Sequence, residues 1–291
     1  MQCMKTIKFE GIGTLWQIDL YSSVSDQELG YLEMLILKRV EEFERNYSRF
    51  RYDSFTNITL QERGTFNLPH DAEPLFSLYQ KLYHITDGAF TPFIGQVLAD
   101  AGYDAAYSFK SKALSTPPRW EDTMDYHYPT VTIKKPEILD FGAGGKGYLI
   151  DIISDLIKEN GALEFCIDAG GDIRYEGAMP FRVGLENPNN LEQAIGIVTL
   201  SQTSLCASAG SRRKWGTFHH IINPHTLSSP SNIIATWTLA KDTLTADALS
   251  TSLFLVSPQK LLPHFDFEYL TLFADNSFEK SPSFPAELFL K

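Results

Sequence analysis

Two oxygen-bearing side chains, Asp247 and Thr251, lie four positions apart in the segment TADALSTSLF. On a helix, this spacing places both side chains on one side. A carboxylate and a hydroxyl are hard oxygen ligands that suit Mg²⁺, which usually completes its octahedron with water and substrate phosphates. The spacing by itself favours a structural explanation, in which the aspartate lies near a helix N-terminus and Thr251 faces the core.

A second chemical candidate is the glycine-dense segment LDFGAGGKGYLID, which covers residues 139–151. Bare backbone amides at the start of a helix can approach a phosphate closely. The glycines of a formal GxGxxG pattern are Gly142, Gly144 and Gly147. Asp168 follows about twenty residues later, as in a dinucleotide-binding fingerprint. The mid-chain position, the intruding Lys146 and the lack of a βαβαβ pattern argue against that fingerprint, and a tight turn without a ligand is a further alternative.

Two further segments carry polar groups next to strand-like runs. Gly170, Gly171 and Asp172 follow an apolar run, where they fit either a ligand contact or a plain hairpin turn. The segment FHHIINPHT holds three histidines, but it has no HxxxH helix and no matching carboxylate for a metal site. One histidine that acts as an acid or base, or that contacts a phosphate, is the better functional interpretation, and His220 is the candidate. Core packing explains this histidine equally well.

These side chains must be positioned by a mixture of helices and strands. The first helix begins with a capping box formed by Ser25 and Glu28. The predicted helices are 25–46, a stretch from just after Asp71 to near Gly88, 146–161 and 247–257. The predicted strands are 131–135, 137–141, 164–168, 181–187, 195–200 and 232–240. Helices and strands do not alternate regularly, so the pattern favours an α+β fold. We predict a long connection from Gly102 to Pro129.

The composition excludes several classes of protein. The 291 residues carry 25 Lys and Arg against 36 Asp and Glu, a formal net charge of −11. An acidic surface disfavours nucleic-acid binding and anionic membranes, although a local phosphate site remains compatible. No apolar run is long enough for a membrane span or a signal peptide. Cys3, Cys166 and Cys206 form no CxxC pair, which argues against a disulfide framework and a zinc site. We expect a cytoplasmic protein, with residues 1–291 forming one domain or two closely packed subdomains.

The motifs, taken together and in order, resemble those of the ApbE-like family of FAD:protein FMN transferases. The matching positions are Ile12 to Thr14, Ser48 with Phe50 and Ser54, Asp87 to Thr91, Asp140 to Gly147, Gly170 to Asp172, His220 to Pro224, and Ala246 to Thr251. The sequence departs from the family pattern at Ile12 (Met), Thr91 (Asp), Asn223 (Asp) and Ser208-Ala209-Gly210 (Thr-Ser-Gly).

The resemblance implies an ApbE-like α+β fold with mixed or antiparallel sheets, packed helices and an FAD cleft beside Mg²⁺. It implies that FMN moves from FAD to a threonine or serine hydroxyl of an acceptor flavoprotein domain, forming a phosphoester bond and releasing AMP. The implied magnesium ligands are the Ala143 carbonyl, Asp247 and Thr251. The implied FAD contacts are Ile12, Phe50, Ala89, Phe90, Thr91, Lys146, Gly170, Gly171, Asp172 and Ile222. His220, Asp247 and Lys146 are the implied catalytic residues, with His220 as the base for the acceptor hydroxyl.

Three other functions compete with this one. The same fold could hydrolyse the FAD pyrophosphate and give FMN to water, or it could hold FAD without catalysis. A nicotinamide-dependent oxidoreductase built on the GxGxxG glycines is the third. Chelation of metal separates them, because it should abolish turnover only in the two magnesium-dependent reactions.

Overall fold

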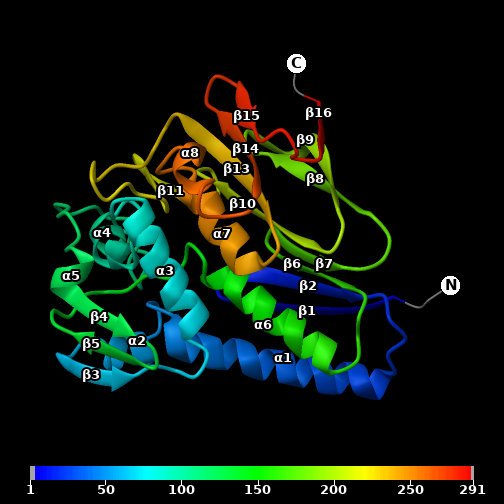
Figure 1. Cartoon of the computed structure of the whole chain (residues 1–291), viewed down its shortest axis with the longest axis horizontal. Helices are drawn as coiled ribbons and strands as arrows, with labels where there is room; N and C mark the ends of the chain where they lie inside the picture. Colours follow the sequence, from blue (N-terminus) through cyan, green and yellow to red (C-terminus); the bar gives the residue numbers. More distant parts are fainter. Residues whose placement is uncertain (1–3, 290–291) are drawn as a thin grey trace.

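The computed structural model describes residues 4–289, and a single large antiparallel sheet organises them (Figure 1). From one edge to the other, its eight strands are β1 (Lys5–Gly11), β2 (Thr14–Leu20), β6 (Phe165–Ala169), β7 (Asp172–Glu176), β10 (Thr203–Ala209), β13 (Ile233–Ala240), β14 (Glu268–Phe273) and β15 (Phe278–Lys280). Every neighbouring pair is antiparallel. The sheet therefore joins the N-terminal hairpin to strands more than 140 positions later, because β2 pairs with β6 through Trp16 and Ala169.

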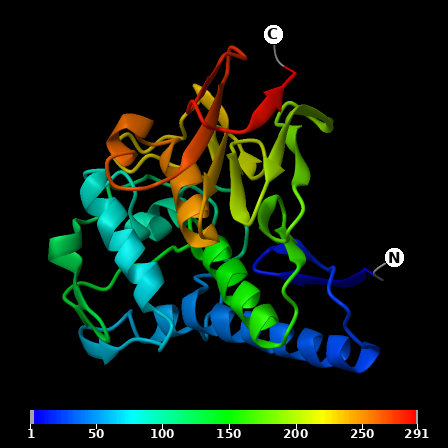
Figure 2. The same ribbon diagram turned by 45° about the vertical axis from the view of Figure 1, so that its right-hand side comes forward.

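Three smaller sheets flank the large one. The first has the order β16-β9-β8, with β16 (Ala286–Leu288), β9 (Asn190–Leu200) and β8 (Phe181–Asn187). The second has the order β3-β5-β4, with β3 (Gly64–Asn67), β5 (Thr130–Ile133) and β4 (Met124–His127). The third is a short pair, β11 (Lys214–Trp215) and β12 (Phe218–His219). In Figure 2 the β8-β9-β16 sheet lies beside the large sheet, at the end opposite α1.

The helices are α1 (Asp26–Tyr47), α2 (Phe55–Ile58), α3 (Glu73–Ile85), the 3₁₀ helix η1 (Pro92–Ile94), α4 (Gly95–Asp100), α5 (Trp120–Thr123), α6 (Gly145–Glu159), α7 (Thr243–Ser252) and α8 (Pro258–Leu261). Three of them, α1, α6 and α7, make most of the helical contacts with the large sheet. Helix α6 contacts both α1 and α7, and the first turns of α6 and α7 meet in both views (Figures 1 and 2). This meeting point matters for the site described below.

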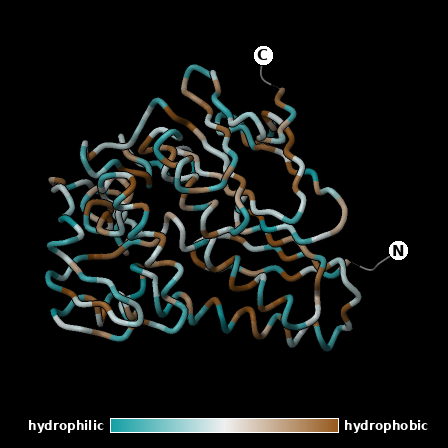
Figure 3. The backbone as a smooth tube through the Cα atoms, viewed as in Figure 1, coloured by the Kyte–Doolittle hydropathy of each residue, from teal (hydrophilic) through white to brown (hydrophobic). Residues whose placement is uncertain are grey.

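Helix α1 forms where the sequence predicts it. The Ser25 Oγ accepts a hydrogen bond from the Glu28 amide at 3.2 Å, while the Glu28 carboxylate accepts one from the Ser25 amide at 2.8 Å. This reciprocal pair satisfies amides that the first turn leaves without partners. The turns of α1 alternate between hydrophobic and hydrophilic colours in Figure 3, as expected of a helix with one buried face. The predicted α6 and α3 are confirmed as well, each within about two residues at its start.

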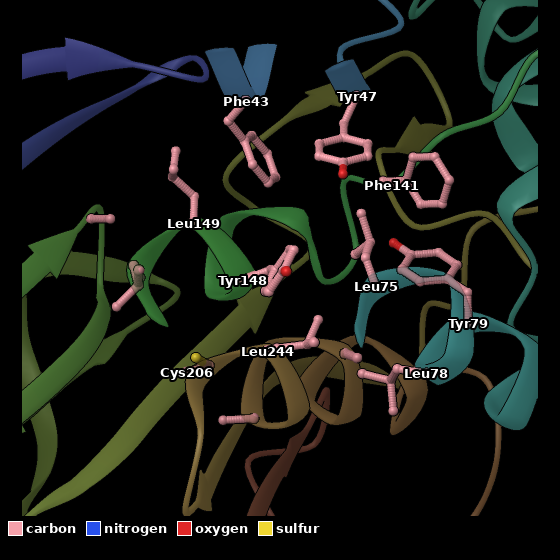
Figure 4. Packing of buried hydrophobic residues seen from close by; sticks show 14 of the residues in the cluster. Phe43, Tyr47, Leu75, Leu78, Tyr79, Phe141, Tyr148, Leu149, Cys206 and Leu244 are labelled. Atoms are coloured by element: carbon pink, nitrogen blue, oxygen red, sulfur yellow. The ribbon is translucent and has the colours of Figure 1, made fainter. Parts of the chain in front are cut away.

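The main core lies where α1, α3, α6 and α7 converge. Figure 4 shows aromatic and aliphatic side chains from all four helices directed toward one another. The labelled members are Phe43, Tyr47, Leu75, Leu78, Tyr79, Phe141, Tyr148, Leu149, Cys206 and Leu244. A second core lies between the large sheet and the β8-β9-β16 sheet, and it includes Leu185, Val198 and Trp237.

Several predictions about elements are wrong. Residues 137–141 form no strand; Leu139 and Phe141 are buried, but the Asp140 amide donates to the Pro92 carbonyl at 2.8 Å rather than to a neighbouring strand. The predicted connection from Gly102 to Pro129 contains α5 and β4. Helix α7 begins four residues earlier than predicted and ends at Ser252.

The antiparallel sheet also contradicts the dinucleotide-binding alternative. The GxGxxG glycines precede α6, but the segment before them is not a strand, so no parallel βαβ unit exists in the described chain. Cys166 and Cys206 are buried and form no disulfide, whereas Cys3 lies outside the described residues. Among residues 4–289, no helix is both long and apolar enough to cross a membrane.

Candidate active site

A cavity of about 830 Å³ lies where the β1–β2 turn, the start of α6, the β6–β7 turn, the 207–222 segment and α7 meet. Most residues singled out from the sequence line it. These are Phe50, Ala89, Phe90, Thr91, Ala143, Lys146, Gly170, Gly171, His220, Ile222, Asp247 and Thr251. Ile12 and Asp172 do not line it. The fold thus gathers positions separated by up to about two hundred residues into one space.

Asp247 lies where α6 and α7 cross, and a glycine permits the crossing. A Cβ on Gly147 would lie 2.2 Å from the Thr243 carbonyl oxygen and 2.7 Å from the Asp247 Cβ. Only hydrogen fits there, so the Gly147 amide can donate to the Asp247 Oδ2 at 2.8 Å. Burial raises the pKa of Asp247, while the charge of Lys146, the Gly147 amide and the charge of Arg213 act in the opposite direction. A cation in the cavity would therefore be compensated by a carboxylate that is only 4% exposed.

A second carboxylate fixes the start of α7. Asp151 of α6 accepts hydrogen bonds from the amides of Thr243 at 2.9 Å and Leu244 at 2.8 Å. Burial raises the pKa of Asp151 to about 6, although these amides lower it. The N-cap residue Asp242 accepts from the Thr245 amide at 2.7 Å. Two carboxylates thus satisfy three amides of the first turn, which holds Asp247 one turn further on in a defined place.

Thr251 lies one turn after Asp247 on the same face of α7, as the spacing predicts. The Ser208 hydroxyl of β10 lies 3.3 Å from the Thr251 Oγ1 and 2.7 Å from the Ser250 Oγ. Ser208 stands at the first position of the altered Thr-Ser-Gly motif, so the serine that replaces the threonine contacts the site. The turn that carries Ala143 packs against the same helix, since a Cβ on Gly144 would lie 3.4 Å from the Ala248 Cβ.

Lys146 and Asp172 form an ion pair. Asp172 is fully buried, and its Oδ1 accepts from the Ala207 amide at 3.1 Å. The family resemblance implies that Asp172 contacts FAD, but in the structure Asp172 pairs with Lys146 and lies outside the cavity lining. Because a buried carboxylate needs a charge partner, Asp172 holds the ammonium group at the cavity wall.

Two tight turns bring backbone to the cavity. Gly170 and Gly171 have φ of +65° and +97°, and a Cβ on Gly170 would lie 2.2 Å from the Thr14 Oγ1. The adjoining Asp168, whose spacing fits the dinucleotide-binding alternative, accepts from the Gly171 amide at 2.8 Å. Ile12 has φ of +44°, donates its amide to Glu44 at 2.9 Å and packs on the core.

Phe50 belongs to an aromatic cluster at one side of the cavity. Its ring stacks on Tyr107 with centroids 5.4 Å apart, and it meets Tyr103 edge-on at the same distance. The Arg49 guanidinium lies 4.0 Å from the Phe50 ring centroid and forms an ion pair with Asp140. Asp140 also accepts from the Gly142 amide at 2.8 Å. The Ser48–Ser54 loop and the glycine turn before α6 are therefore joined through Arg49.

Thr91 replaces the aspartate of the family pattern and has a local role. Its side chain accepts from the Phe93 amide at 3.2 Å and caps η1. A threonine can cap a helix as an aspartate does, though without the charge. The preceding Asp87 is turned away from the cavity and pairs with Lys260, in a turn where Asp87 and Gly88 both have positive φ.

His220 and its neighbour His219 have different surroundings. His219 is held by the Pro230 carbonyl, 2.9 Å from its Nε2, and by the Ile221 amide, so it is a packing residue. His220 lines the cavity, and its buried Nδ1 has no hydrogen-bond partner in the described chain. Burial, the charge of Arg213 and then His219 lower the pKa of His220 to about 3, so the imidazole is neutral near pH 7. His225 lies outside the cavity lining.

Comparison with known proteins identifies this arrangement. The model of the ApbE family matches residues 12–269. This chain belongs to the ApbE family. A Haemophilus influenzae protein named FAD:protein FMN transferase is 25% identical over 271 residues, which cover 84% of this chain and 78% of the relative. A Treponema pallidum protein of the same name is 24% identical over 282 residues, covering 86% and 78%. The match to the Escherichia coli protein is shorter, covering 42% of this chain and 38% of that relative.

Solved structures agree with the fold. The flavin transferase ApbE from Vibrio cholerae superposes with a TM-score of 0.81 at 19% identity, covering 97% of this chain and 98% of that chain. The ApbE protein from Thermotoga maritima superposes with a TM-score of 0.83 at 20% identity, covering 98% and 100%. The predicted α+β, ApbE-like fold is confirmed.

The ApbE-family site offers oxygen donors for a hard cation. Across residues 4–289, no group of three or more His, Cys, Asp and Glu side chains gathers. A metal at Asp247 would therefore have one carboxylate, the Thr251 hydroxyl and a backbone carbonyl such as that of Ala143, with the remaining positions left to water and phosphate oxygens. This donor set suits Mg²⁺, which commonly keeps several waters and binds through one or two carboxylates and substrate phosphates. The residues present fit the ion.

Sequence reasoning misses four side chains that shape this ApbE-family cavity. Tyr103 and Arg213 line it, Arg49 braces Phe50, and Ser208 contacts Thr251. Arg49 and Ser208 lie inside or beside the quoted motifs, and their place as polar residues in these motifs could have indicated a role in the site. Tyr103 and Arg213 lie in segments without a motif, and only the fold brings them to the cavity.

Proposed function

We propose that this chain is a magnesium-dependent FAD:protein FMN transferase, which moves FMN from FAD onto a threonine or serine hydroxyl of an acceptor flavoprotein and releases AMP. The observation that carries the proposal is the single cavity that gathers Lys146, His220, Asp247 and Thr251. The names of the curated relatives support the reaction class.

The first turn of α6 favours a pyrophosphate. Gly144 caps this helix without a side chain, but the amides of Gly145 and Gly147 already donate to the Phe141 carbonyl and to Asp247, so the helix acts on a phosphate mainly through its dipole. A helix N-terminus carries partial positive charge and attracts phosphate. Lys146 adds a full positive charge at the same turn, held at the wall by Asp172. Together they bind and orient the two phosphates of FAD.

His220 receives the proton of the acceptor hydroxyl. In the reaction, a bond forms between the hydroxyl oxygen and the FMN phosphorus, and the bond from that phosphorus to the bridging oxygen breaks, so this oxygen leaves with AMP. A neutral imidazole has one ring nitrogen free to accept the proton. Its low pKa weakens it as a base in the empty cavity, but an anionic pyrophosphate nearby raises the pKa again.

Asp247, Thr251 and the Ala143 carbonyl would hold Mg²⁺. When bound, the ion neutralises pyrophosphate charge and helps to orient the reacting groups. Asp247 supplies the balancing negative charge, and its position depends on the Gly147 amide.

The test is a product analysis. The purified protein is incubated with FAD and Mg²⁺, with and without EDTA, and with and without an acceptor domain that carries a target threonine. AMP together with an acceptor heavier by one FMN supports the proposal. AMP with free FMN identifies a pyrophosphatase, and bound FAD without AMP identifies a flavin-holding protein.

Two aspartate variants test the metal assignment. Asp247→Asn removes the carboxylate and should abolish AMP release. Asp155→Asn makes the same change on the exposed side of α6, where the nearest cation is Lys158 at 4.0 Å, and serves as the control. Equal rates in both variants would contradict the assignment of Asp247.

A further inference from the structure

Arg213 brings a guanidinium group to the wall of the cavity from a segment without any motif. Its Nη1 donates to the Tyr103 hydroxyl at 2.9 Å, and its Nη2 lies 3.5 Å from the Gly13 carbonyl oxygen. Its own carbonyl accepts from the His220 amide at 3.1 Å. Arg213 therefore touches the β1–β2 turn, the segment after α4 and the proposed base.

The charge of Arg213 is not neutralised by a carboxylate of the described chain. The other cations near the cavity differ in this respect, since Lys146 pairs with Asp172, Arg49 with Asp140, and Arg212 with Glu186 at 2.9 Å. Lys8 also lines the cavity without an ion pair, and both it and Arg213 are exposed residues, but in the described chain only Arg213 of the two is held in place by side-chain hydrogen bonds. The hydrogen bonds of Arg213 are to neutral oxygens, so its charge remains available to a ligand.

The field of Arg213 reaches the reacting groups. Arg213 and His220 line the same cavity, the His220 amide donates to the Arg213 carbonyl, and the charge of Arg213 lowers the pKa of His220. Before an anionic ligand binds, this repulsion disfavours the imidazolium that His220 must form. A ligand that carries negative charge between them removes the conflict, because it attracts both cations.

We propose that Arg213 binds the pyrophosphate of FAD and offsets the negative charge that grows on the departing AMP phosphate. This inference rests on the proposed function and adds a catalytic residue to it. A guanidinium presents a planar fork of donors that matches phosphate oxygens, whereas a lysine acts as a point charge. Two of its donors are already committed to Tyr103 and Gly13, which holds the fork in place before FAD enters.

The test compares Arg213→Ala and Arg213→Lys with Lys214→Ala. Lys214 is the adjacent cation in the same short hairpin, is exposed and does not line the cavity, so it controls for net charge and hairpin stability. Affinities for FAD and ADP are measured by titration with Mg²⁺ and without acceptor, and transfer is then followed at saturating FAD. Thermal denaturation reports on folding.

Arg213→Ala should weaken FAD and ADP binding about tenfold or more, which corresponds to the loss of a charge-assisted hydrogen bond. It should lower the transfer rate at saturating FAD by a further factor of ten or more, because charge grows on the leaving phosphate. Arg213→Lys should recover part of the binding and little of the rate, and Lys214→Ala should stay within twofold of the wild type.

Unchanged FAD affinity in Arg213→Ala overturns the inference, as does an equal loss in Lys214→Ala, which would show a general effect of the hairpin. If the wild type binds FAD but transfers nothing to any acceptor, the proposed function fails while the FAD and ADP titrations still decide the role of Arg213. A wild type that binds neither FAD nor ADP contradicts both.

Discussion

Replacing Gly147 by alanine tests the contact between α6 and α7 on which the site depends. The new Cβ would lie 2.2 Å from the Thr243 carbonyl oxygen, so the helices must separate. Overpacking of this kind costs about 1–3 kcal/mol. The hydrogen bond from the Gly147 amide to Asp247 would also be weakened, which adds about 1.5–3 kcal/mol for a charged acceptor. Alanine returns about 1 kcal/mol through its higher helix propensity. We expect a net loss of about 1.5–5 kcal/mol.

Gly30→Ala is the matched control. Gly30 lies inside α1, and a Cβ there meets nothing within 4 Å. This variant should gain about 1 kcal/mol from helix propensity alone. Urea denaturation followed by circular dichroism measures both changes, and FAD titration measures the site. If Gly147→Ala is as stable as Gly30→Ala and binds FAD as well as the wild type, the close crossing of α6 and α7 does not position the site.

Three further predictions concern groups around the cavity. Asp172→Asn should lower stability by about 3 kcal/mol, because it leaves Lys146 without its partner. The double variant with Lys146→Met should recover much of this loss in urea denaturation. Additive losses would show that the two groups are independent. Burial lowers the pKa of His220 from 6.5 to about 3 in the folded state, so the unfolded state takes up the proton first as the pH falls. The free energy of unfolding should therefore decrease from pH 6.5 downward, by about 2 kcal/mol at pH 5. His220→Asn should lose correspondingly less stability between pH 7 and pH 5, and identical pH profiles would refute the low pKa. Gly170→Ala and Gly161→Ala share a positive φ, but only Gly170 faces another atom closely, the Thr14 Oγ1 at 2.2 Å; Gly170→Ala should therefore be the less stable variant and the weaker FAD binder, and equal denaturation midpoints would contradict this contact.

Local signals predict the elements that carry their own stability. Helix α1 has a capping box and one apolar face, so its start is readable from Ser25 and Glu28. The strand β8 is predicted at its observed ends because its composition alone indicates extended backbone. Apolar content wrongly predicts a strand at residues 137–141, because the burial of Leu139 and Phe141 does not require a partner strand.

Long-range contacts account for most of what the sequence does not reveal. Helix α7 begins at Thr243 because Asp242 and the distant Asp151 satisfy its first amides, and the pairing with Asp151 leaves no local trace. The β1–β2 hairpin has a β-branched Ile12 at positive φ, where a turn usually has Gly, Asn or Asp. For the candidate site, most of the residues that the motif resemblance named line the cavity. The resemblance placed Asp172 among the FAD contacts, whereas in the structure Asp172 is buried and paired with Lys146.

The wall of the cavity is drawn from positions between Lys8 and Leu255, which include members of the main core and of the second core. No fragment of the chain contains the whole cavity, so FAD can bind only the completed native state. Mass action then makes the flavin a stabiliser of its own enzyme, adding about 2.7 kcal/mol when its concentration is a hundred times the dissociation constant. The cellular lifetime of the protein should consequently follow the flavin supply, and flavin starvation should expose it to proteolysis before any change in its synthesis.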